Sequence, residues 1–98
     1  LRELLDRWVD PAAWGPDDVV ITNDPYCGGQ HLPDIVAFKP VEHEGRRIAF
    51  VGTLCHHIDV GGLAAGSYAA KAIEIYQEGL RIPPVKLIEN GVRNEGVW

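Results

Sequence analysis

Histidines and aspartates gather in two glycine-rich segments of this chain, where hydrophobic packing gives no reason for them. The segments are NDPYCGGQHLPD, residues 23–34, and CHHIDVGG, residues 55–62, which together hold three of the four histidines. The fourth, His43, stands between two glutamates at a predicted exposed hairpin tip. Imidazoles and carboxylates are common ligands of divalent metal ions in proteins. The clustering therefore predicts a metal site.

His31 and Asp34 are the first two candidate ligands, and Leu32 and Pro33 separate them. Proline disfavours helical geometry in the residue before it, so a turn rather than a helix must bring the two side chains together. The preceding residues 26–30, YCGGQ, contain two glycines that allow positive φ angles and a close approach to a ligand. A plain loop at the end of a strand has the same composition.

His56 and His57 directly follow an apolar strand. Successive side chains on a strand point to opposite faces, so only one of these two joins His31 and Asp34 around an ion. Two neutral imidazoles and one carboxylate suit Zn, Mn or Fe and leave positions open for water or substrate, as in catalytic sites. The alternative is that the histidines are ordinary core or surface groups.

Asp24 and Asp59 each precede turn-forming residues, so we favour turn roles over metal binding for both. Other chemistries lack their motifs. No glycine loop followed by Lys-Ser or Lys-Thr is present, so this chain is not expected to bind ATP itself. No G-x-S-x-G elbow surrounds the single serine, and non-haem iron oxygenases use a His-x-Asp pair one residue shorter than the pair here.

The elements that must position these residues are predicted from periodicity. Leu1, Leu4, Leu5, Trp8 and Val9 recur at helical spacing, which predicts an amphipathic helix ending near residues 10–11. Residues 17–22 form a β-branched run typical of a buried strand. Residues 69–78 fit either a helix or a strand, and residues 82–87 are extended by their prolines.

Two apolar runs, residues 35–41 and 47–54, flank the turn EHEG and predict a β-hairpin. The second run is apolar on both faces, which predicts a central strand. The expected fold class is α+β, with a mixed, mainly antiparallel sheet, a central hairpin and a flanking helix, as an excerpt of a larger domain.

Composition limits the class of protein. The 98 residues are 46% hydrophobic, as expected for a single partial domain spanning 1–98, and the absence of methionine suggests an excerpt of a longer polypeptide. A net charge of −5 without basic clusters argues against a nucleic-acid partner. No apolar run is long enough for a membrane span, so we expect a soluble, cytoplasmic protein. Cys27 and Cys55 are expected to be reduced, with Cys55 buried.

The segments NDPYCGG, HLPD, HHIDVGG and EIYQEGLRIPPVKL, in this order over residues 15–95, resemble the hydantoinase B/oxoprolinase family. This family includes B-type subunits of N-methylhydantoinases and 5-oxoprolinases, and it is related to the large subunits of acetone and acetophenone carboxylases. The resemblance implies ATP-dependent hydrolysis of a cyclic amide, hydantoin or 5-oxoproline, in a hetero-oligomer whose A-type subunit binds the ATP.

The resemblance also assigns roles to residues. It implies that His31, Asp34 and His56 bind a divalent metal ion, and that His57 or Asp59 orients groups or shuttles protons nearby. Two alternatives stay open. One is a subunit of an ATP-dependent carboxylase acting on a ketone. The other is a non-catalytic domain whose histidines fill a core or hold a structural ion.

Overall fold

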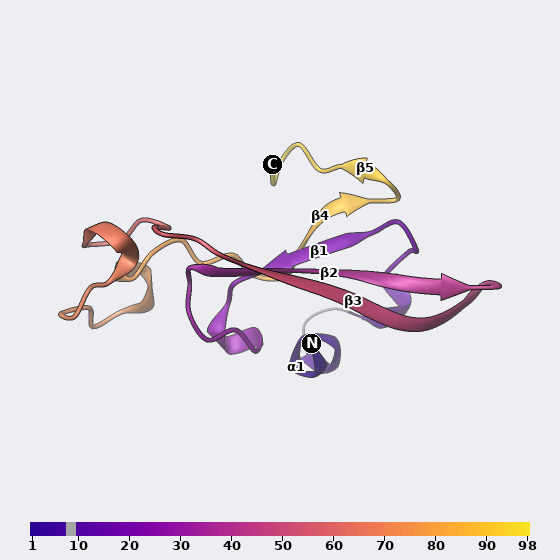
Figure 1. The fold of residues 1–98 in the computed structure, drawn as a ribbon, viewed down its shortest axis with the longest axis horizontal. Coiled ribbons are helices and arrows are strands. Elements are labelled where there is room, and N and C mark those ends of the chain that lie inside the picture. Colours follow the sequence, from indigo (N-terminus) through magenta and orange to yellow (C-terminus); the bar gives the residue numbers. More distant parts are fainter. Residues whose placement is uncertain (8–9) are drawn as a thin grey trace.

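One antiparallel sheet of five strands organises the chain, in the order β3-β2-β1-β4-β5 (Figure 1). The computed structural model describes residues 1–7 and 10–98. Every pairing found there is antiparallel, so the expected mainly antiparallel sheet is confirmed, without a parallel part. The strands are β1 (Val19–Thr22), β2 (Asp34–His43), β3 (Arg46–His56), β4 (Val85–Glu89) and β5 (Val92–Arg93).

The predicted hairpin is confirmed as β2 and β3. Their register runs from Asp34 opposite His56 to His43 opposite Arg46. The connecting residues Glu44 and Gly45 have φ angles of 50° and 72°, the positive values that a tight hairpin turn requires. His43 lies at the exposed tip, as predicted.

The position predicted for the second hairpin strand is wrong. β3 lies at the edge of the described sheet, and β1, which pairs with both β2 and β4, takes the centre. Most of β3 is exposed, including Ile48, Val51 and Leu54. An apolar pattern on both faces indicates that a strand favours burial, but it does not determine the order of strands in the sheet. From β3, the side chain of Phe50 packs against the core.

The core is small and lies between the sheet and the N-terminal segments. Leu4 of α1 (Arg2–Arg7) packs with Trp14, Val20 and Cys27, and the ring of Trp14 meets that of Phe50 edge-on at 5.3 Å. Figure 1 shows α1 on one side of the sheet. The predicted N-terminal helix is confirmed over these residues, while Trp8 and Val9 lie outside the described part of the chain.

Residues 69–78 form neither of the predicted regular elements. They belong to a lobe of loops, residues 58–80, at the end of the hairpin opposite its tip (Figure 1). Within it lie two short 3-10 helices, η3 (Ala65–Ser67) and η4 (Ile75–Gln77). Two more, η1 (Pro11–Ala13) and η2 (Pro25–Cys27), flank β1.

Two further expectations concern the cysteines and a membrane span. Neither cysteine forms a disulfide within the described residues, as expected, but Cys55 is exposed because β3 is an edge strand, so its predicted burial is wrong. Among the described residues, no helix has the length and apolar character needed to cross a bilayer.

Candidate metal and substrate pocket

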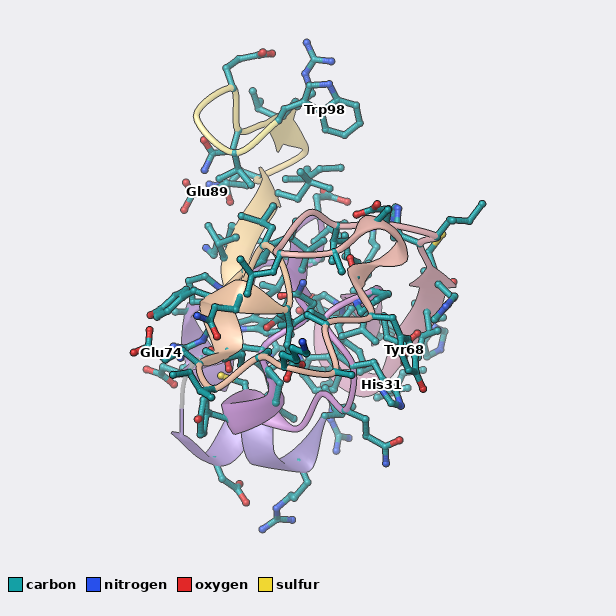
Figure 2. All side chains as sticks on the ribbon, turned by 90° about the vertical axis from the view of Figure 1, so that its left-hand side faces the viewer. His31, Tyr68, Glu74, Glu89 and Trp98 are labelled. Carbon is teal, nitrogen blue, oxygen red and sulfur yellow. The ribbon has the colours of Figure 1, made fainter. Side chains whose placement is uncertain are left out.

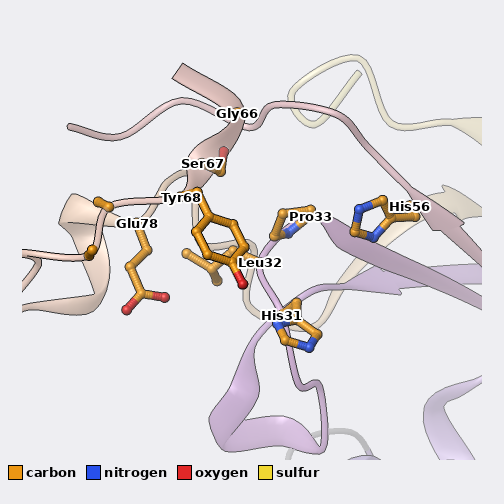
Figure 3. Close-up of a pocket in the computed structure, with 10 residues that line it drawn as sticks. His31, Leu32, Pro33, His56, Gly66, Ser67, Tyr68 and Glu78 are labelled. Atoms are coloured by element: carbon orange, nitrogen blue, oxygen red, sulfur yellow. The ribbon is translucent and has the colours of Figure 1, made fainter. Parts of the chain in front are cut away.

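A pocket of about 330 Å³ lies where the start of β2, the end of β3 and the 58–80 lobe meet (Figure 3). Its volume falls at the small end of the range for ligand sites, and its wall mixes apolar side chains with a few polar groups, as such sites do. The lining residues are His31, Leu32, Pro33, His56, Gly66, Ser67, Tyr68, Ala69, Ala70 and Glu78.

The hairpin register brings Asp34 and His56 together at this pocket. The two residues are opposite each other in the β2–β3 ladder, and His56 Nδ1 lies 2.6 Å from Asp34 Oδ1. Since an ionised carboxylate only accepts hydrogen bonds, Nδ1 is the donor in this contact, which directs Nε2 of the His56 ring away from Asp34. A carboxylate that orients an imidazole in this way is the usual partner of a metal-binding histidine.

His31 reaches the same pocket through a turn. The N–H of Asp34 donates to the carbonyl oxygen of His31 at 3.0 Å, which closes the turn that the proline predicted. Leu32 inside the turn is buried, with 2% exposure, and anchors it. Figure 2 views the molecule from this end and shows His31 next to Tyr68, with Glu74 on the other side of the lobe.

Two imidazoles and one carboxylate have the chemistry of a divalent metal site. His31 and His56 line the pocket, and Asp34 is hydrogen bonded to His56. In the part of the chain that the structure describes, however, no three His, Cys, Asp or Glu side chains are grouped closely enough to hold a metal ion. The structure therefore pairs Asp34 with His56 and places His31 at the same pocket, and metal binding by the three stays a prediction.

His57 and Asp59 do not line the pocket. The carboxylate of Asp59 accepts hydrogen bonds from the N–H groups of Gly66 and Gly61, at 2.8 and 2.7 Å, and from the Ser67 hydroxyl. These hydrogen bonds, that from Gly66 foremost, lower the pKa of Asp59. The predicted turn role of Asp59 is confirmed. A proton-shuttling role for either residue stays a prediction.

Asn23, directly after β1, stabilises the segments that form the pocket, a role that the sequence did not predict. Its buried Nδ2 donates to the carbonyl oxygens of Leu32 and Leu80, at 2.7 and 2.8 Å, and its Oδ1 accepts from the N–H of Ile82 at 2.6 Å. Asn23 thus joins the His31 turn to Leu80 and Ile82, which lie 57 and 59 residues after Asn23 in the sequence. The available signal was a polar residue directly after a buried strand, which must find partners.

Asp24 and Arg81 reinforce this junction. Asp24 is fully buried, accepts from the N–H of Tyr26 at 2.9 Å as its predicted turn role requires, and meets Arg81 Nη2 at 2.7 Å. Burial alone would raise the pKa of Asp24, but hydrogen bonds from Arg81 and Tyr26 and the charge of Arg81 outweigh it and lower the pKa. The Arg81 guanidinium also lies over the Tyr26 ring, 5.1 Å from its centre.

Two backbone hydrogen bonds close the base of the 58–80 lobe, from Leu63 N–H to the Gln77 carbonyl and from Leu80 N–H to the Val60 carbonyl, both 2.8 Å. Gly62 allows this approach. It has a φ of +107°, and an added Cβ would lie 2.6 Å from the Gln77 carbonyl oxygen. The pocket wall formed by the lobe therefore depends on a residue without a side chain.

We expect Gly62→Ala to open the base of this lobe, at a cost of about 1–3 kcal/mol from backbone strain alone. Hydrogen exchange of the Leu63 and Leu80 amides should accelerate at least about tenfold more than in Gly61→Ala. Gly61 is the matched control because its φ is also positive, +88°, while nothing lies within 4 Å of an added Cβ. Equal exchange in the two variants would refute the close-contact explanation.

Comparison with known proteins gives consistent matches over most of the chain. The sequence profile of the hydantoinase B/oxoprolinase family matches residues 1–98. The chain is 40% identical over 98 residues to 5-oxoprolinase 1 of Arabidopsis thaliana, covering 99% of this chain and 8% of that protein. It is 44% identical over 80 residues to the caprolactamase subunit beta of Pseudomonas jessenii, covering 82% and 14%.

Two solved structures share the fold. The crystal structure of the ATP-dependent caprolactamase from Pseudomonas jessenii superimposes with a TM-score of 0.84 at 38% identity, over 98% of this chain and 16% of that chain. A nucleotide-free structure of acetone carboxylase superimposes with a TM-score of 0.77 at 29% identity, over 89% and 11%. The chain thus spans less than a fifth of the length of these relatives.

Proposed function

This chain belongs to the hydantoinase B/oxoprolinase family, and from that premise we propose that it forms the metal-bearing part of a B-type subunit that hydrolyses a cyclic amide. ATP is used by an A-type partner subunit, since this chain has no phosphate-binding loop of its own. The observation that carries the proposal is a single pocket lined by His31 and by His56, whose ring is hydrogen bonded to Asp34. Relatives named as a 5-oxoprolinase and a caprolactamase support a cyclic amide as substrate.

The residues of the pocket have distinct tasks in this proposal. His31, Asp34 and His56 hold the ion, with Asp34 also orienting the imidazole of His56. A divalent ion bound there supplies Lewis-acid chemistry for an amide carbonyl or a water molecule. His57, the chain neighbour of His56, moves protons near the ion. The apolar side chains of Leu32, Pro33, Ala69 and Ala70 in the pocket wall exclude water from one side of the substrate ring.

The test uses the complete B-type subunit together with its A-type partner. Metal analysis should find a bound divalent ion, and the complex should open 5-oxoproline, hydantoin or caprolactam only when ATP is present. Removal of the ion with a chelator should stop turnover without unfolding the subunit. Turnover that survives complete metal removal would refute the assignment of the metal to catalysis.

Carboxylation of a ketone is the second candidate function, favoured by the superposition on acetone carboxylase. It predicts ATP-dependent turnover that requires bicarbonate and a ketone, which ring opening does not. The non-catalytic alternative predicts that chelation unfolds the subunit. Its version with core histidines is wrong, because His31, His56 and His57 are all exposed.

A further inference from the structure

A carboxylate, that of Glu78, lines the same pocket as His31 and His56. Figure 3 shows its side chain extending beside the ring of Tyr68, with His56 on the far side of the pocket. Within the described residues, the Glu78 carboxylate makes no hydrogen bond and no ion pair, whereas that of Asp34 is engaged by His56. Glu78 is exposed to solvent, so its acceptor capacity is available to water or to a molecule bound in the pocket.

An ionised carboxylate accepts hydrogen bonds and cannot donate them. The group that it binds must therefore carry an N–H or O–H, and a negative charge beside it is unfavourable. The same pocket also has an apolar part of its wall, formed by Leu32, Pro33, Ala69 and Ala70. A small ring with methylene groups fits against this wall, and one N–H on that ring is the complement of the carboxylate.

We propose that Glu78 is a specificity-determining residue that binds the amide N–H of a cyclic amide, while Tyr68 covers one face of the ring. The proposal rests on the proposed function for the identity of the reaction. It distinguishes a lactam from a simple ketone, which has no N–H for the carboxylate. His31 and His56 cannot distinguish the two substrates, because a lactam and a ketone both present a carbonyl oxygen.

Calorimetric binding to the complete subunit in its complex tests the proposal without requiring turnover. The probes are γ-butyrolactam and ε-caprolactam, each compared with its N-methyl derivative. Glu78→Gln should weaken the better-bound lactam about tenfold, because hydrogen bonds to an ionised acceptor are about twice as strong as neutral ones. The N-methyl derivative should bind weakly and equally to both forms.

Glu44→Gln, at the hairpin tip on the opposite end of the sheet, is the matched control and should leave lactam binding unchanged (Figure 1). Tyr68→Phe keeps the ring and should retain binding, whereas Tyr68→Ala should weaken it. Unchanged metal content and circular dichroism in Glu78→Gln ensure that a loss of binding is not a loss of folding.

Three results would overturn the proposal: equal lactam affinity in Glu78→Gln and the natural sequence, equal affinity for a lactam and its N-methyl derivative, or no binding of either lactam. ATP-dependent turnover is measured separately. Glu78-dependent lactam binding without ATP-dependent ring opening would refute the proposed function and leave the role of Glu78 standing. ATP-dependent ring opening that is unchanged in Glu78→Gln would refute the role of Glu78 and leave the proposed function standing.

Discussion

Replacing His56 by alanine in the complete B-type subunit is expected to remove its divalent ion and to reduce ATP-dependent ring opening more than about 100-fold. Mutation of a group that only orients a metal-binding histidine already lowers metal affinity or activity by about 10–100-fold. Removal of a metal ligand itself should cost more. His56 is hydrogen bonded to Asp34 and lines the pocket, so its removal affects two of the three proposed ligands. Metal analysis and steady-state rates, measured on the same preparation, check the prediction.

His43→Ala provides the matched control, because His43 is also an exposed histidine of the same hairpin but stands at its tip. It should retain both metal and activity. His31→Ala should behave like His56→Ala, since His31 lines the same pocket from a different loop. Full metal content and full activity in either pocket variant would rule out the proposed ligand set.

The second large effect is on stability. Asp24→Ala is expected to lower the free energy of unfolding by about 3 kcal/mol, because it removes one partner of a buried ion pair. Asp24 has no exposed surface, and its carboxylate binds both the Arg81 side chain and the N–H of Tyr26. We choose the lower end of the usual range since Arg81 is partly exposed and keeps some hydration. Chemical denaturation and hydrogen exchange at residues 80–82 measure the change.

Asp6→Ala is the control for this prediction. Asp6 is also paired with an arginine, Arg2, at 2.6 Å, but both side chains are largely exposed. Such surface pairs contribute little, so the unfolding midpoint should hardly change. An equally small effect of Asp24→Ala would show that the junction around Asn23 does not need the buried pair.

Acid should weaken the same junction. The pKa of Asp24 is lower in the folded chain than its ordinary value of 3.8, and that of Asp18 is lowered likewise. For Asp18, burial opposes the shift, and hydrogen bonds from Lys86 and from the N–H groups of Asn90 and Gly15 outweigh it. Below 3.8 the unfolded chain binds more protons than the folded one, so stability is lost as the pH falls through the folded-state pKa. In Asp24→Ala this acid dependence should be reduced.

Local features of the chain were predictable where neighbouring residues determine them. The hairpin followed from two apolar runs around EHEG, and its confirmed register is what places Asp34 opposite His56. The Asp24 and Asp59 turns followed from the residues after them, and their hydrogen bonds confirm both. Residues 69–78 were ambiguous because their apolar pattern fits both periods, and loop contacts replaced either element.

The sequence by itself determined the family, the hairpin and the residue types available for chemistry, because these depend on composition and short-range spacing. The tertiary structure alone decided that β3 lies at the edge, that Asn23 and Arg81 support the His31 turn, and that Glu78 lines the same pocket as His31 and His56. The side-chain contacts of Asn23 and Arg81 join residues 9 to 59 positions apart in the sequence. The periodicity of a segment describes only that segment, so it does not indicate which distant residues will contact it. Such contacts depend on the free energy of folding the whole sheet and its lobe, including the entropy lost on closing the loops between them.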